Sequence, residues 1–258
     1  MGFETAYKLN KNSLKFMFFV LSICRLFSFW SYRKIRKHNL ELSKFKKSKR
    51  VVIMGLGPSA NDLDFDSIDC DTIVVNRFIR YSLQKGFKRN PTFYCFADDA
   101  FYTTEKKFID ESIASFSDTA FLLNGKYIKN VKNYSKRNNV FFGFFQKAFC
   151  SPKKALDFCK RIPMNMNVVG FAIELALYLG YEKIEIYGLD FTSALTKKAI
   201  HCYSEAHVET SEPFKLTYYY NSIAYEQFDC YKKYSIAHNV KIVNKSKISL
   251  VDCFEFED

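Results

Sequence analysis

The feature that most constrains the fold is a regular alternation, after residue 50, of short apolar runs with longer segments of helical periodicity. The apolar runs are typical of buried strands, which we expect at Val51–Met54, Thr72–Asn76, Thr92–Phe96, Ala120–Leu123, Lys183–Tyr187 and Val240–Val243. Between them we expect helices at Tyr102–Phe116, Pro152–Ile162, Val169–Leu179 and Ser222–Ala237. This order predicts an α/β fold with a Rossmann-like, mainly parallel sheet and helices on both faces.

The candidate ligand site follows from this fold, because open parallel sheets bind ligands beyond the carboxyl ends of their strands. The segments that follow the predicted strands are Gly55–Ser59, Asn76–Arg77, Ala97–Asp99 and Gly188–Thr192. Residues 192–217 have little periodicity, and a long loop of this kind inside a domain is typically functional. We therefore expect an active-site loop at about 192–217.

The basic charge of the chain is confined to its N-terminal arm. Residues 1–50 hold 13 Lys and Arg against 2 Asp and Glu, whereas residues 51–258 hold 26 against 25. This distribution divides the chain into an arm at 1–48 and a catalytic domain at 49–258. Because the domain adds no basic excess, nucleic acid is not an expected partner.

The arm also contains an aromatic, apolar run that ends in Trp30 and Tyr32 and is interrupted by Arg25. A charge at this position is costly at the centre of a bilayer. We expect a basic amphipathic helix that lies in the membrane interface, with residues 14–50 contacting the membrane surface. A core helix followed by a solvated basic linker remains the alternative.

The turn Gly55-Leu56-Gly57-Pro58-Ser59-Ala60 follows the first predicted strand and formally matches the dinucleotide-binding fingerprint. Two features argue against NAD. Pro58 removes a backbone donor, and the second strand ends in Asn76, where an acidic residue would bind the ribose. The amide of Asn76 is suited to a ribose or a base edge. A purely structural role in tight turns remains open for the glycines and for Asn76.

Four stretches, VVIMGLGPSANDLD, DTIVVNRF, PTFYCFADDAFY and ALYLGYEKIEIYGLDF, resemble the bacterial lipooligosaccharide sialyltransferases over roughly residues 49–258. That family carries G-N-G-P-S after its first strand, C-N-[QR]-F after its second and A-L-G-Y-K-x-I-x-x-x-G-I-D-F before its active-site loop. The same skeleton resembles the broader group of hydroxymethylpterin diphosphokinase-like domains.

The resemblance implies metal-independent transfer of a sialic-acid-like sugar from a CMP-sugar donor to a glycan or glycolipid acceptor such as lipooligosaccharide. It implies nucleotide binding by the following residues: Gly55, Leu56, Gly57, Pro58, Ser59, Asn76, Arg77, Asp98, Gly170, Gly188, Asp190 and Thr192. The chain departs from the family at Leu56, which is Asn there, and at Thr192, which is Tyr. Tyr218–Tyr220 stand near the position of the general-base His of the family, so sialyl specificity does not follow.

Sugar transfer needs a general base for the acceptor hydroxyl and a group that stabilises the departing phosphate. Of the four histidines, His201 and His207 lie near the expected cleft, and either is suited to take the proton. Tyr203, Thr192 and Arg77 are candidates to hydrogen-bond the phosphate. Two alternatives remain open: that the two histidines are solvated loop residues without a catalytic role, and that Asp190 is a buried capping residue.

The pair Asp98–Asp99 raises the hypothesis of a metal site, but adjacent side chains on an extended backbone point to opposite sides, so we expect no metal cofactor. Asp62, Asp64 and Asp66 are ordinary turn residues by the same analysis. Two alternative functions remain. One is a diphosphokinase-like enzyme that uses ATP and magnesium with Asp98, Asp99 and Asp190, and the other is a non-catalytic nucleotide-binding relative.

Eight scattered cysteines without a C-x-x-C pair indicate neither a zinc site nor a disulfide framework, and are typical of a protein that faces the cytosol. Together with the arm, they predict a cytoplasmic protein that is peripheral on the inner face of the bacterial inner membrane. The aromatic content of 18% is compatible with a homo-oligomer.

Overall fold

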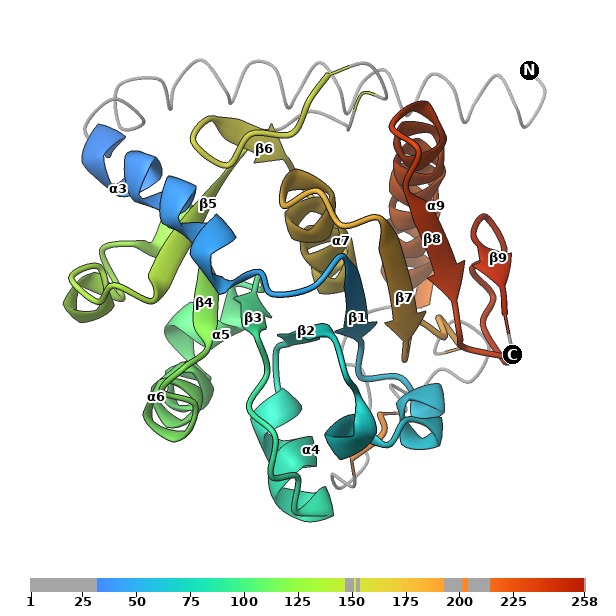
Figure 1. The fold of residues 1–258 in the computed structure, drawn as a ribbon, viewed down its shortest axis with the longest axis horizontal. Helices are drawn as coiled ribbons and strands as arrows, with labels where there is room; N and C mark the ends of the chain where they lie inside the picture. Colours follow the sequence, from blue (N-terminus) through green and yellow to red (C-terminus); the bar gives the residue numbers. More distant parts are fainter. Residues whose placement is uncertain (1–31, 147–150, 152–153, 193–200, 204–213, 258) are drawn as a thin grey trace.

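The computed structural model describes residues 32–146, 151, 154–192, 201–203 and 214–257. Within them, nine parallel strands form one sheet in the order β6-β5-β4-β3-β2-β1-β7-β8-β9 (Figure 1). The strands are β1 (Arg50–Met54), β2 (Asp71–Val75), β3 (Phe93–Phe96), β4 (Ala120–Asn124), β5 (Val140–Gln146), β6 (Arg161–Pro163), β7 (Lys183–Tyr187), β8 (Lys241–Asn244) and β9 (Glu255–Phe256). The predicted α/β fold is confirmed, and each of the six predicted strands is present.

Helices cover both faces of the sheet (Figure 1). Alternate strand residues supply the two cores, so that Val51 and Ile53 face one layer and Val52 and Met54 face the other. The first layer contains η1 (Asn39–Phe45), α7 (Val168–Tyr178) and α9 (Phe214–Ala237). The second contains η3 (Phe65–Ser67), α4 (Phe78–Lys85), α5 (Ala100–Thr103) and α6 (Lys106–Ser115). The remaining short helices are α3 (Arg33–His38), η2 (Pro58–Asp62), η4 (Gly125–Tyr127) and η5 (Lys132–Tyr134).

Three expected helices differ from the structure. The helix predicted at Pro152–Ile162 is wrong, because residues 154–160 form bends and turns before β6 begins. The helix predicted at Tyr102–Phe116 is interrupted between α5 and α6, where Glu105 precedes the first turn of α6. Helix α9 begins at Phe214 and so occupies the end of the loop expected at 192–217. Of that loop, Thr192, residues 201–203 and the start of α9 are described.

The segment before β1 is part of the domain, although the sequence analysis assigned it to the arm. Asn39 is fully buried, and its Nδ2 donates hydrogen bonds of 2.8 Å to the carbonyl groups of Phe142 and Phe158. Its Oδ1 accepts the amide of Phe142 at 3.3 Å. Leu42 is also fully buried, in the core between η1 and the sheet. Residues 32–48 therefore pack on the domain through both polar and apolar contacts.

The expected membrane-interface helix falls mainly within residues 1–31, which lie outside the described residues. In the described part of the chain, no helix combines the length and the apolar character that crossing a bilayer requires.

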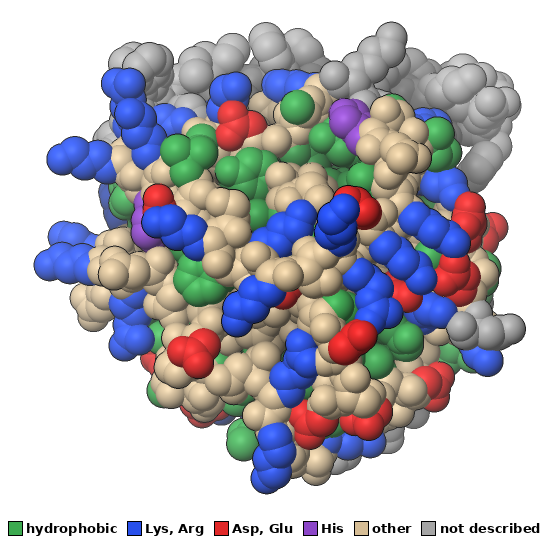
Figure 2. Space-filling model, in the orientation of Figure 1, with side chains coloured by type: hydrophobic (Ala, Val, Ile, Leu, Met, Phe, Trp, Pro, Cys, Tyr) green, Lys and Arg blue, Asp and Glu red, His purple; other side chains and the backbone are tan. Residues whose placement is uncertain are grey.

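Charged side chains are mixed on the face drawn in Figure 2, where Lys and Arg lie among Asp and Glu. Around Glu257, for example, hydrogen bonds from Lys241 and Lys183 lower the pKa of the carboxyl group to about 2. This mixture agrees with the nearly balanced charge of residues 51–258.

We predict that Asn39→Ala destabilises the protein by about 3 kcal/mol, because three buried main-chain hydrogen bonds lose their partner. Urea denaturation of the full chain measures the change. Lys37→Ala, two residues earlier and exposed, is the control and is expected to change the unfolding free energy by less than about 0.5 kcal/mol. Equal effects of the two substitutions would contradict the proposed role of the segment in the domain.

Candidate functional site

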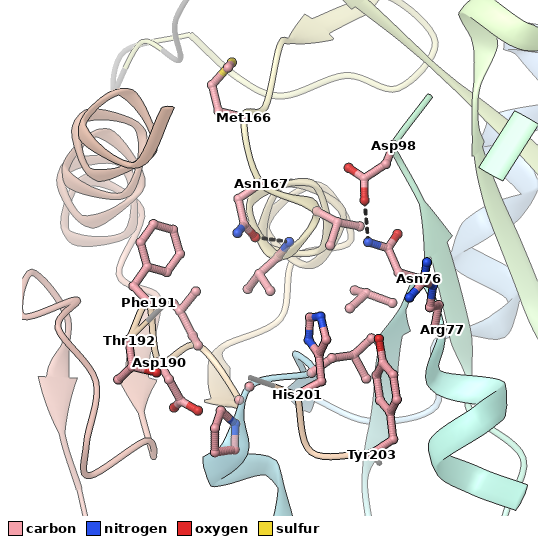
Figure 3. A pocket seen from close by; sticks show the side chains of 18 of the residues that line it. Asn76, Arg77, Asp98, Met166, Asn167, Asp190, Phe191, Thr192, His201 and Tyr203 are labelled. Atoms are coloured by element: carbon pink, nitrogen blue, oxygen red, sulfur yellow. Dashed lines mark hydrogen bonds between the residues drawn. The ribbon is translucent and has the colours of Figure 1, made fainter. Parts of the chain in front are cut away.

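The order of the strands reverses between β1 and β7, and an open parallel sheet binds its ligands at such a reversal point. A cavity of about 490 Å³ opens at this point, between the ends of β1, β2, β3 and β7 and the start of α7 (Figure 3). Predicted site residues that line it are Leu56, Gly57, Pro58, Asn76, Arg77, Asp98, Gly188, Asp190, Thr192, His201 and Tyr203. The carboxyl ends of the strands thus bring most of the candidate residues together.

Three predicted residues do not line this cavity. Gly55 and Ser59 lie beneath its floor, and Gly170 lies inside α7. A Cβ atom on Gly170 would stand 2.5 Å from Oδ1 of Asn165, so the glycine makes room for that side chain. His207 lies outside the described residues.

The glycine turn is locked to the loop after β7. The amide of Gly55 donates to Tyr187 O at 2.7 Å, and the amide of Gly57 donates to Gly188 O at 3.0 Å. Gly188 has φ of +70°, and a Cβ atom there would stand 2.7 Å from the carbonyl carbon of Gly55. The backbone amides of Gly55 and Gly57 therefore donate to groups of the protein itself. The outer surface of the turn lines the cavity.

Asp190, in the loop after β7, also holds the glycine turn through hydrogen bonds from Ser59. Its carboxylate is buried and accepts the backbone amide of Ser59 at 2.9 Å and the Ser59 hydroxyl. The hydroxyl of Ser59 also lies 2.8 Å from that of Ser246. Asp190 therefore has the buried capping role that the sequence left open, with its carboxylate directed to Ser59.

Asn76 forms a wall of the cavity at the end of β2. Its backbone has a positive φ of 47°, a conformation that Asn tolerates better than most residues. Its carbonyl group accepts the Tyr94 hydroxyl at 2.6 Å, and its Nδ2 donates to Asp98 at 2.6 Å. Its Oδ1 is buried and has no hydrogen-bond partner within the described residues. Asn76 thus retains an unused acceptor.

Arg77 stands next to it and is held in a fixed orientation. Its Nε donates to Glu105 at 3.0 Å, its Nη2 donates to the other carboxylate oxygen, and its guanidinium stacks over the ring of Phe108. Burial opposes the charge, but hydrogen bonds with Glu105 and Tyr203 outweigh it and raise the Arg77 pKa. The arginine therefore remains a cation, anchored at the cavity wall.

The segment His201–Tyr203 closes the cavity next to Arg77 (Figure 3). The amide of Cys202 donates to Leu56 O at 2.9 Å, which fixes the segment to the glycine turn. The imidazole of His201 stacks on the ring of Tyr203, with centroids 5.0 Å apart, and Tyr203 is buried. Two predicted catalytic residues thus lie together on the side of Arg77.

Asp98 and Asp99 diverge, as their adjacency predicted. Asp98 turns to Asn76, whereas Asp99 forms an ion pair with Lys126 at 2.8 Å. Within the described residues, no group of three or more His, Cys, Asp or Glu side chains could hold a metal ion.

Several cavity residues were missed by the sequence analysis, among them Glu105, Met166, Asn167 and Asn221. Asn167 carried a usable signal, since Asn before a run of helical periodicity is typical of a helix start. Its Oδ1 accepts the amide of Val169 at 2.7 Å at the start of α7. Glu105 carried no such signal, because its position depends on the interruption between α5 and α6.

Sequence comparisons and structure comparisons give different results. No protein-family model and no curated protein matches the sequence. The fold is similar to the sialyltransferase CstII from Campylobacter jejuni in complex with the substrate analogue CMP-3FNeuAc, with a TM-score of 0.51, 16% identity and coverage of 81% of this chain and 86% of that one. It is also similar to the MAf glycosyltransferase from Magnetospirillum magneticum AMB-1, with a TM-score of 0.51, 12% identity and coverage of 87% of this chain and 38% of that one. The protein thus has a sialyltransferase-like fold.

We predict that Gly188→Ala costs roughly 2 kcal/mol more in unfolding free energy than Gly180→Ala. The two glycines have nearly the same backbone, with φ of +70° and +68°, so the left-handed strain of about 1 kcal/mol is shared. Only at Gly188 does the new Cβ atom meet the backbone of Gly55, whereas nothing lies within 4 Å at Gly180. Urea denaturation of both variants measures the difference, and equal costs would show that the two loops are not in close contact.

Proposed function

We propose that this protein is a glycosyltransferase that moves a sugar from a CMP donor to a glycan acceptor. The observation that carries the proposal is the convergence of Asn76, Arg77 and Tyr203 on one cavity at the reversal point of a parallel sheet. A volume of about 490 Å³ suits a small-molecule ligand. The likeness of the fold to a sialyltransferase solved with a CMP-sugar analogue supports the same class of reaction.

The residues divide into two groups by the part of the donor that they suit. Arg77 and Tyr203, with Thr192 from the loop after β7, are suited to the phosphate that departs with the nucleotide. Because Glu105 and Phe108 already fix the guanidinium, its charge requires little rearrangement during the reaction. Asn76, with its unused acceptor, is suited to the nucleoside.

The finer parts of the proposal concern the sugar, the acceptor and the location. We assign a sialic-acid-like sugar and a cell-surface glycolipid such as lipooligosaccharide, on the motif resemblance and the shared fold. Residues 14–31 would hold the protein at the cytoplasmic face of the inner membrane, which raises the effective concentration of a lipid-linked acceptor. Leu56 and Thr192, which differ from the family motif, are the positions at which the donor sugar could differ.

The diphosphokinase-like alternative requires several carboxylates for magnesium, and two of its three candidates, Asp99 and Asp190, are engaged elsewhere. Asp190 accepts hydrogen bonds from Ser59, and Asp99 is paired with Lys126 and does not line this cavity, so that Asp98 alone is left. This arrangement favours the transferase. A non-catalytic nucleotide-binding protein would have the same binding residues. Only a measurement of turnover distinguishes it from a transferase.

We predict that CMP stabilises the full chain without magnesium, in a thermal-shift panel of CMP, CDP, UDP, GDP and ATP measured with and without the metal. A ligand at a hundredfold excess over its Kd adds about 2.7 kcal/mol to the folded state. Stabilisation by ATP with magnesium alone would overturn the transferase and favour the diphosphokinase. The full chain is required, because residues 32–48 pack on the domain.

We predict further that Asn76→Ala weakens CMP binding about tenfold, the loss expected for one hydrogen bond. Asn239→Ala is the matched control, since Asn239 also has a positive φ, of 55°, but lies exposed after α9. Both variants carry the same left-handed backbone, so a larger loss of affinity in Asn76→Ala reflects the loss of its side chain at the cavity, together with the hydrogen bond to Asp98. Titration calorimetry with CMP measures both affinities, and equal affinities would exclude Asn76 from the nucleotide site.

A further inference from the structure

A second cavity, of about 820 Å³, adjoins the first. Its walls come from the ends of β4, β5 and β6 and include aromatic and polar side chains, such as Tyr32, Asn124, Phe144, Arg161 and Tyr220. Flat aromatic rings and amides are the groups that contact the apolar faces and hydroxyl groups of sugars. Asp98, Met166 and Asn167 line both cavities, so the two spaces meet at these three side chains.

The meeting place matters because sugar transfer requires a donor and an acceptor with their reacting atoms in contact. If the first cavity holds the nucleotide sugar, as proposed above, an acceptor in the second places its hydroxyl group at this boundary. Met166 has no group that takes up a proton. Asn167 is an amide whose oxygen already accepts the amide of Val169. Of the three shared side chains, Asp98 is therefore the one that can act as a base.

The position of Asp98 fits this role. It follows β3, and its Oδ2 accepts Asn76 Nδ2 at 2.6 Å, while no hydrogen bond to Oδ1 is formed within the described residues. Figure 3 shows it on the opposite side of Asn76 from His201 and Tyr203. Tyr203, which is suited to the departing phosphate, thus lies on the other side of Asn76 from the carboxylate, while Arg77 lies beside Asn76 (Figure 3).

We propose that Asp98 is the general base of the transfer and that the second cavity is the acceptor site. The acceptor hydroxyl oxygen forms a bond to the anomeric carbon of the donor sugar. The bond from that carbon to the phosphate oxygen breaks, and its electron pair leaves with the nucleotide. The hydroxyl proton passes to Asp98 and then to solvent. His201, on the side of Tyr203, does not receive it.

The surroundings of Asp98 set the expected pH dependence. The side chain of Asp98 is exposed to the cavity, but the surrounding protein partly desolvates it and so raises its pKa; Asp99 and Glu105 add to the rise, and the Asn76 hydrogen bond and Arg77 oppose it. The other charged side chains that line the second cavity are Lys126, Lys129 and Arg161. Because a base must be ionised to accept a proton, kcat falls as pH is lowered through this raised pKa.

The test uses the full chain with CMP-N-acetylneuraminate as donor probe and a fluorescent lactoside as acceptor probe, and follows both the labelled product and the release of CMP. We expect Asp98→Asn to lower kcat about a hundredfold or more, whether kcat is measured by formation of the labelled product or by release of CMP. Because the amide oxygen of Asn can accept the same hydrogen bond from Asn76, the variant still binds CMP, which also shows that it is folded. The acidic limb of the kcat profile disappears in this variant.

Three further variants keep the test specific. Asp98→Glu retains a carboxylate, so a slower enzyme with the acidic limb restored is expected. Asp99→Asn removes the neighbouring carboxylate and is expected to keep the limb. An acidic limb that survives in Asp98→Asn, or that disappears in His201→Gln, would overturn the assignment of the base. A wild type that binds CMP but releases none from the donor would overturn the proposed function itself, and this inference with it.

Discussion

The contact between the glycine turn after β1 and the loop after β7 is the constraint on which the site depends. The two loops approach so closely that Gly55 and Gly188 leave no room for a side chain, and Asp190 ties them together through Ser59. The floor of the cavity is the upper surface of this contact. The segment that carries His201 and Tyr203 is in turn fixed to Leu56 of the same turn. Backbone hydrogen bonds at the centre of the sheet thus determine where the candidate catalytic side chains lie.

A second polar cluster positions the opposite wall of the cavity. Glu174 is fully buried in α7, where it contacts the Tyr231 hydroxyl at 3.0 Å and accepts Nδ2 of Asn165 at 2.7 Å. Burial raises the pKa of Glu174 well above its ordinary value. Gln227 of α9 accepts the amide of Met166 at 3.0 Å. Helices α7 and α9 therefore hold the loop that lines both cavities, as the glycine turn holds their floor.

Much of the fold could be predicted from the sequence, because alternating apolar runs and helical periodicity reflect burial on a parallel sheet. The same rule placed most candidate residues at one cavity, since they follow the strands directly. The directions of side chains were less predictable. The hydrogen bond between Asp190 and Ser59 joins positions 131 residues apart, so no local pattern could decide between a ligand-binding role and a capping role for this carboxylate. Glu105 reached the cavity because a predicted helix is interrupted, and Gly170 proved to accommodate Asn165.

Tyr32 is the first residue of the described domain and also a wall of the second cavity, where its ring stacks on Phe144 at 5.7 Å. The described domain thus begins at a wall of that cavity. Because Phe144 belongs to β5, a change of side chain at either ring would reshape the second cavity while leaving the glycine turn and the loop after β7 untouched.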